Sequence, residues 1–238
     1  PDDPAPLRVL AAGETVTSPE VHLGLMHGSF DDAVGLWHRH VRASVIPPRP
    51  KGKAMYTIGG RMVEKPGAWM KKEIDIAAEM GLEAFMVDAG WHGEKFTPYP
   101  ALIGDWMAGD WLPGGMAGLR HYAHRHGMLF GLWQAPEGIH VTSKLFRDHP
   151  DWEMLTDGGR AMSSECKLLN LANPAAAKYF TDCVLRTIKG FKLDFYKIDG
   201  AGYFFEGGQN PVHGFVENEF WRHYEAVYSA YDRVRREC

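Results

Sequence analysis

The sequence predicts an α/β protein whose main part is a partial (β/α)8 barrel, or TIM barrel, of about four βα units. From residue 53 onward, short runs rich in aromatic and branched residues alternate with helical patterns. Long excursions follow two of the predicted strands, at residues 90–115 and 136–173, as is typical of an active-site face. No glycine-rich nucleotide-binding loop follows the first strand, which disfavours a doubly wound sheet.

The barrel elements follow one another in a regular order. A helix with Pro66 near its start and Gly81 as its stop follows the first strand, and a helix over residues 116–126 follows the second. A third helix begins with Asn173 as N-cap and ends at Gly190, and the last helix occupies residues 216–238. Parallel pairing with right-handed crossovers is expected for such βα units. The predicted strands lie at 54–59, 83–88, 128–133 and 193–199.

The first 52 residues have a different pattern. A turn-rich strand is predicted around residues 15–25 and a short amphipathic helix at residues 31–41. The prolines of residues 47–52 cannot continue that helix and indicate a linker. The first residue is not methionine, and the last helix ends without glycine or proline, so we expect a piece of a longer protein.

Composition narrows the functional classes. The chain has 238 residues, 45% of them hydrophobic and 24% charged, which suits a globular domain with a sizeable core. A net charge of −4 gives no basic patch for nucleic acid, and no apolar run approaches the roughly 18 residues of a membrane span. Three cysteines without a C-x-x-C pair and a start unlike a signal peptide together favour the cytoplasm.

Polar and aromatic side chains gather where the predicted strands end. Lys197 and Asp199 are two residues apart, so they share one face of a strand. Asp88 and Trp91 end another strand, and Trp133 ends a third. Carboxylates walled by indoles suit a sugar, whose C–H faces pack on aromatic rings while its hydroxyls need charged partners. Gly131 is expected to leave space beneath the Trp133 indole. Asp199 could attack an anomeric carbon, with the Lys197 cation favouring its ionised form.

Each of these residues also has a purely structural interpretation. Lys197 and Asp199 can form a surface ion pair, Asp88 can serve a turn, and Trp133 can belong to the core. Their matching places in successive strands favour a site. Two other functions stay open: a Schiff-base aldolase or lyase with Lys197 as the nucleophile, and a non-catalytic carbohydrate-binding module.

The twelve histidines raise the alternative of a metal site. Those at residues 121, 124 and 126 lie on one predicted helix. A metal-dependent barrel hydrolase would need histidines at its strand ends, and the first strand offers none. Solvated helix faces and packing between domains explain them better, and we expect no metal and no cofactor.

An ordered set of motifs resembles the melibiases, the retaining α-galactosidases of glycoside hydrolase clan D. The set runs through nearly the whole chain, and its order is more specific than any single piece. It comprises Asp88-Ala89-Gly90-Trp91, Gly104-Asp105-Trp106, Leu112-Pro113-Gly114-Gly115, the segment 127–133 with Pro136-Glu137, His149-Pro150-Asp151-Trp152 and Lys197-Ile198-Asp199.

The resemblance implies a domain organisation and residue roles. Residues 1–30 would be the end of an N-terminal β-sandwich, 31–52 a helix and proline-rich linker, and 53–238 the first half of the catalytic barrel. Asp199 matches the nucleophile, and Lys197 a lysine that binds sugar hydroxyls. Asp88 matches an aspartate that holds the non-reducing sugar, and Trp133 an aromatic wall of the same subsite.

The resemblance also implies what this chain lacks. The family's acid/base aspartate lies on a later strand, beyond Cys238, so the fragment alone is expected not to turn over. Ala89 stands where the family usually has a second aspartate, which indicates a divergent member. The expected reaction is double displacement on terminal α-linked sugars. The expected partners are an α-linked oligosaccharide or glycoside and the remainder of the polypeptide, with homo-oligomerisation left open and nucleic acid and membranes excluded.

Overall fold

The structure is a computed structural model, which describes residues 8–18, 20–46, 58–59, 68–93, 100–109, 112, 114–154, 165–199, 209–218 and 220–238. The chain divides into two compact units. One comprises Pro1–Val9 with Met55–Cys238, and the other comprises Leu10–Ala54. In the larger unit, parallel strands and helices alternate, so the predicted α/β class is confirmed.

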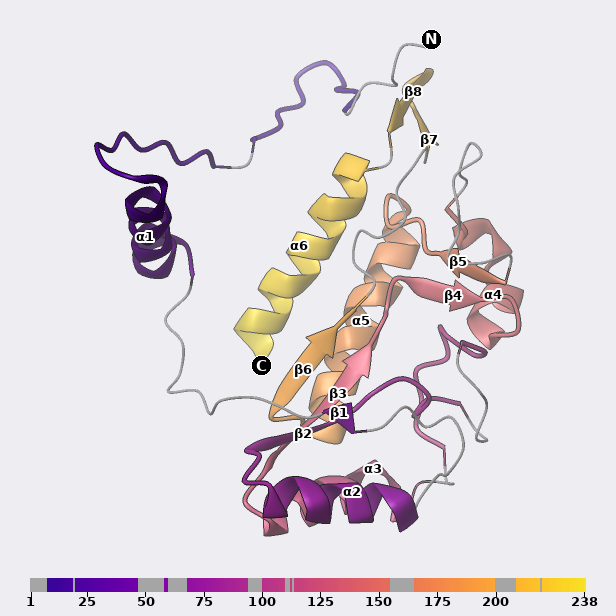
Figure 1. Cartoon of the computed structure of the whole chain (residues 1–238). Helices are drawn as coiled ribbons and strands as arrows, with labels where there is room; N and C mark the ends of the chain where they lie inside the picture. Colours follow the sequence, from indigo (N-terminus) through magenta and orange to yellow (C-terminus); the bar gives the residue numbers. More distant parts are fainter. Residues whose placement is uncertain are drawn as a thin grey trace. The chain divides into compact units, whose positions relative to one another are not determined.

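A four-stranded sheet forms the centre of the larger unit (Figure 1). Its order is β1-β2-β3-β6 and every neighbouring pair is parallel, as the βα pattern predicts. Three predicted strands are confirmed to within two residues, whereas residues 54–57 of the first lie outside the described residues. The strands are β1 Ile58–Gly59, β2 Ala84–Val87, β3 Leu129–Gln134 and β6 Phe195–Ile198.

Helices follow these strands and bury their apolar faces. Met70 and Ile74 of α2, with Leu119 of α3, pack in the same core as the strand residues Phe85 and Phe130. A second core contains Phe180 and Val184 of α5, Val227 of α6, and residues of the segment 139–171. None of the helices in the described ranges is long and apolar enough to cross a membrane. The helices are α2 Ala68–Glu79, α3 Gly115–Arg125, α5 Pro174–Phe191 and α6 Phe220–Glu237.

The end of α5 corrects one sequence prediction. The Asn173 side chain accepts a hydrogen bond from the Ala175 N–H, so the predicted N-cap is confirmed. The helix continues through Gly190, however, and Lys192 takes the left-handed C-cap conformation with φ 53°. The aromatic ring of Phe191 packs 5.7 Å from that of Trp91, which favours keeping the extra residue in the last turn.

Two antiparallel strand pairs were not predicted. In the excursion after β3, β4 (Gly138–His140) pairs antiparallel with β5 (Cys166–Leu168), and the short helix α4 (Lys144–Asp148) lies between them. The second pair is a hairpin that joins β7 (Gln209–Val212) to β8 (Phe215–Asn218). The predicted last helix was therefore wrong at its start, because residues 216–218 form a strand and α6 begins at Phe220.

The smaller unit contains helix α1 (Phe30–His40), close to the prediction, followed by a π-helical turn at Val41–Val45. Ser29 and Asp32 form a capping box at its start. No strand occurs among residues 10–18 and 20–29, so the turn-rich strand predicted around residues 15–25 was wrong for the described residues, and the β-sandwich stays a prediction. Val21, Leu23 and Leu25 are all exposed.

Candidate active site

The parallel sheet brings four predicted site residues to one edge. Asp88 directly follows β2, Trp133 lies near the end of β3, Lys197 lies in β6, and Asp199 follows it. Because β2, β3 and β6 are neighbours, their carboxyl ends meet. The ammonium Nζ of Lys197 lies 3.9 Å from an Asp88 carboxylate oxygen and 3.9 Å from an Asp199 carboxylate oxygen. One cation therefore lies between two carboxylates.

Trp133 makes the shortest contact in this group. Its indole Nε1–H donates a hydrogen bond to Oδ2 of Asp199 over 2.7 Å. Lys197 and Asp199, at 3.9 Å, attract each other across more than hydrogen-bond distance. The Lys197 side chain is 42% exposed and that of Asp199 is 39% exposed, so both can be reached from solvent.

Trp91 and Trp133 are both buried. Trp91 is 0% exposed, and its indole Nε1–H donates to the main-chain carbonyl of Trp133 over 2.7 Å. The Trp106 ring lies between them, 5.8 Å from that of Trp91 and 6.0 Å from that of Trp133. Trp91 thus supports the end of β3, and in this arrangement it presents no ring surface to a ligand.

The space predicted beneath the Trp133 indole is filled. Gly131 and Phe195 are paired residues of β3 and β6, and the Phe195 ring lies over the glycine. A Cβ at residue 131 would lie 2.5 Å from that ring. The glycine therefore admits the aromatic side chain of the neighbouring strand, and the expectation of a vacant space was wrong.

Asp88 combines the two roles that the sequence left open. One carboxylate oxygen accepts a hydrogen bond from the Ala89 N–H over 2.7 Å, which is local turn chemistry. The other faces Lys197. Its side chain is only 14% exposed, so the turn holds a largely buried carboxylate at the edge of the candidate site.

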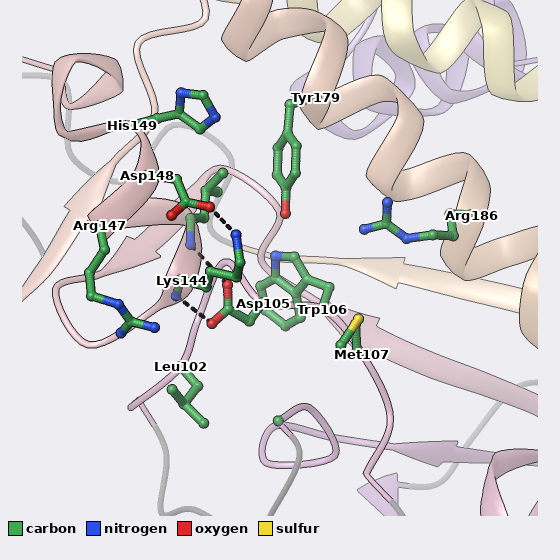
Figure 2. Close-up of a pocket in the computed structure, with 12 residues that line it drawn as sticks. Leu102, Asp105, Trp106, Met107, Lys144, Arg147, Asp148, His149, Tyr179 and Arg186 are labelled. Carbon is green, nitrogen blue, oxygen red and sulfur yellow. Dashed lines mark hydrogen bonds and ion pairs between the residues drawn. The ribbon is translucent and has the colours of Figure 1, made fainter.

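A separate cavity of about 740 Å³ opens beside Trp106. Figure 2 shows Tyr179 and Arg186 reaching from α5 toward the same space, opposite Lys144 and Asp148 of α4. The Asp105 carboxylate accepts hydrogen bonds from two main-chain N–H groups at the start of α4 and so fixes this wall. Asp88, Trp91, Trp133, Lys197 and Asp199 are absent from the described lining.

Sequence reasoning missed one buried ionisable pair. Nε2 of His223, in α6, lies 3.2 Å from Oε2 of Glu137, and both residues are about 1% exposed. Burial, followed by the charge of Glu137, raises the pKa of Tyr231 to about 12. No sequence signal links Glu137 to residue 223, because their contact depends on how α6 packs. Within the described ranges, no group of three or more histidine, cysteine or acidic side chains could hold a metal ion.

Comparison with known proteins finds similarity to alpha-galactosidases. The chain is 28% identical over 196 residues to Alpha-galactosidase 1 of Pediococcus pentosaceus, a match that covers 80% of this chain and 27% of that protein. It is also 28% identical over 244 residues to the bifunctional alpha-galactosidase/sucrose kinase AgaSK of Mediterraneibacter gnavus, covering 96% and 24% respectively. The chain thus spans about a quarter of the length of these relatives.

A solved structure of an alpha-galactosidase is also similar to this chain. The GH36 alpha-galactosidase AgaA of Geobacillus stearothermophilus superposes with a TM-score of 0.58 and 26% identity, covering 68% of this chain and 23% of that one. The model of the Melibiase family matches residues 67–238, which include strands β2, β3 and β6 and every residue of the candidate site. The chain belongs to the Melibiase family.

Proposed function

We propose that the polypeptide carrying this chain is a retaining glycoside hydrolase that removes terminal α-linked galactose, with Asp199 as its nucleophile. The observation that carries the proposal is the cluster of Asp88, Lys197 and Asp199 at neighbouring strand ends. Carboxylates at such a place can bind sugar hydroxyls and attack an anomeric carbon. A variant of AgaA, 25% identical to this chain, has been solved in complex with stachyose, which supports an α-galactoside as the substrate class.

Each group has a role in the proposed reaction. A carboxylate oxygen of Asp199 bonds to the anomeric carbon while the bond from that carbon to the leaving oxygen breaks. Water then cleaves the glycosyl ester and restores the carboxylate. Asp88 and Lys197 hold hydroxyls of the bound sugar. The proton for the leaving oxygen comes from an acid outside these 238 residues, so we expect no turnover by the chain alone.

The aldolase alternative is disfavoured by the same geometry. An imine-forming lysine is activated in an apolar pocket or beside another cation, whereas the Lys197 ammonium lies 3.9 Å from two carboxylates. The alternative of a non-catalytic carbohydrate-binding module can be told from an enzyme by experiment, because sugar binding alone would not require Asp199.

The test is covalent trapping of the longer polypeptide with a fluorinated α-galactosyl fluoride. The ring fluorine slows hydrolysis of the glycosyl ester, while fluoride leaves without needing a proton, so the glycosyl-enzyme should accumulate. Peptide mass mapping is expected to place one galactosyl group on Asp199. Asp199→Ala should abolish labelling, whereas Asp232→Asn, an exposed carboxylate on α6, should leave it intact. Labelling elsewhere, or none, would reject the proposed function.

A further inference from the structure

Trp133 can do more than form one side of a sugar-binding site. Its register partner in β6 is Lys197, and Asp199 lies two residues further along. The indole N–H of Trp133 donates a hydrogen bond to Oδ2 of Asp199 over 2.7 Å. Since Trp133 is only 4% exposed, little of its ring is available for packing on a ligand. The main contact that it offers to the site is this hydrogen bond.

Both ends of the bond are anchored. The Trp133 carbonyl accepts the Trp91 indole N–H, and the Trp106 ring lies against the Trp133 indole. The Asp199 main-chain N–H donates to the Gln134 carbonyl over 2.8 Å, which ties the nucleophile's backbone to β3. Donor and acceptor are therefore held by adjacent strands before any ligand arrives, as preorganised sites require.

We propose that Trp133 is a positioning residue for Asp199, an inference that rests on the proposed function. The hydrogen bond fixes one carboxylate oxygen and so limits rotation of the carboxylate, which decides how an oxygen faces the anomeric carbon. Lys197 cannot fix this orientation, because its ammonium lies 3.9 Å away and supplies charge without a directed bond.

The test separates rate from binding. The longer polypeptide is treated with the fluorinated α-galactosyl fluoride at increasing concentration, and the saturating labelling rate and the half-saturating concentration are measured. Trp133→benzothienylalanine keeps the ring shape and replaces the N–H by sulfur. We expect a saturating rate lower by about tenfold to a hundredfold, as for a small misplacement of a reacting group. The half-saturating concentration should change little.

The matched control is Trp221→benzothienylalanine. Trp221 makes the same kind of bond, from its indole N–H to the Glu225 carboxylate over 3.0 Å, but on the exposed surface of α6. Its saturating rate should equal that of the unsubstituted protein. Trp133→Phe, which also lacks the donor, provides a second variant if the first folds poorly, and circular dichroism checks the fold of each.

The outcomes separate the two proposals. An unchanged saturating rate in both Trp133 variants overturns the positioning role while labelling at Asp199 still supports the proposed function. A change confined to the half-saturating concentration also overturns it, because that result would identify Trp133 as a binding wall. If the unsubstituted protein is not labelled at Asp199, the proposed function fails and this inference fails with it.

Discussion

At the residue scale, Lys197 is the cation that lets two carboxylates lie near one another. Its Nζ is 3.9 Å from each, and at 42% exposure solvent screens part of the attraction. In Lys197→Ala the carboxylates of Asp88 and Asp199 lose this shared counter-charge and a sugar loses a hydroxyl partner. We expect kcat/KM for an aryl α-galactoside to fall by about tenfold.

The control for this substitution is Lys178→Ala. Lys178 also pairs with a carboxylate, that of Asp182, but on the exposed surface of α5. Its kcat/KM should remain that of the unsubstituted protein. Equal values for the two alanine variants would contradict the assigned role of Lys197.

Gly131 provides a second residue-scale prediction. A methyl group there would lie 2.5 Å from the Phe195 ring, so Gly131→Ala must displace a packed aromatic side chain. We expect the free energy of unfolding to fall by about 1–3 kcal/mol, measured in urea. Adding Phe195→Leu should recover part of it. Gly190→Ala, with no atom within 4 Å of the added methyl and a helical position, should instead stabilise by roughly 0.5–1 kcal/mol.

These contacts show where sequence reasoning ends. The i, i+2 spacing of Lys197 and Asp199 is enough to predict a shared face, and the structure confirms their proximity. The contact of Gly131 with Phe195 depends on the register between β3 and β6, which local patterns do not determine. For the same reason the sequence could name Trp133 as a site residue but not its bond to Asp199.

At the element scale, a helix or strand is easier to predict from the sequence when its periodic pattern is longer. The helices over 68–79 and 115–125 repeat their apolar spacing for three turns, so they were found within a few residues. The four-residue strand β8 runs into the apolar pattern of α6, so the sequence pattern wrongly assigns its residues 216–218 to the helix. A hairpin that short is defined by its partner strand more than by its own composition.

The segment after β2 contains a buried histidine, His92, which should make the stability of the protein depend on pH. His92 is 1% exposed and bridges to Ala108, and burial lowers its pKa from 6.5 to about 4. Between these values the unfolded chain binds a proton that the folded protein does not. The free energy of unfolding should therefore fall as the pH drops from about 7 to 4, with His92 contributing about 3 kcal/mol of the loss.

Urea unfolding across that pH range checks the contribution of His92. His92→Gln keeps a hydrogen-bond donor but cannot titrate, so its stability should depend less steeply on pH than that of the unsubstituted protein. His38→Gln, on the exposed surface of α1, should keep the original dependence. Parallel curves for His92→Gln and the unsubstituted protein would contradict the prediction.

At the scale of the whole molecule, the chain spans about a quarter of the length of its relatives. The candidate site contains the proposed nucleophile, Asp199, and the groups proposed to bind a sugar, while the resemblance assigns the acid/base to a later strand. In retaining enzymes the two carboxyl groups lie about 5–5.5 Å apart, which leaves no room for a water molecule between sugar and nucleophile. The position of that acid thus determines the stereochemistry of the product.

We expect the longer polypeptide to release α-galactose first, because two displacements at the same carbon restore its configuration. Proton NMR of an aryl α-galactoside digest, recorded before mutarotation, distinguishes the anomers. Methanol as a competing acceptor should give the methyl α-galactoside. Release of β-galactose first would mean that water attacks directly, with carboxyl groups about 6.5–9.5 Å apart. Asp199 would then be a base that activates water, and trapping on its carboxylate should fail in the same protein.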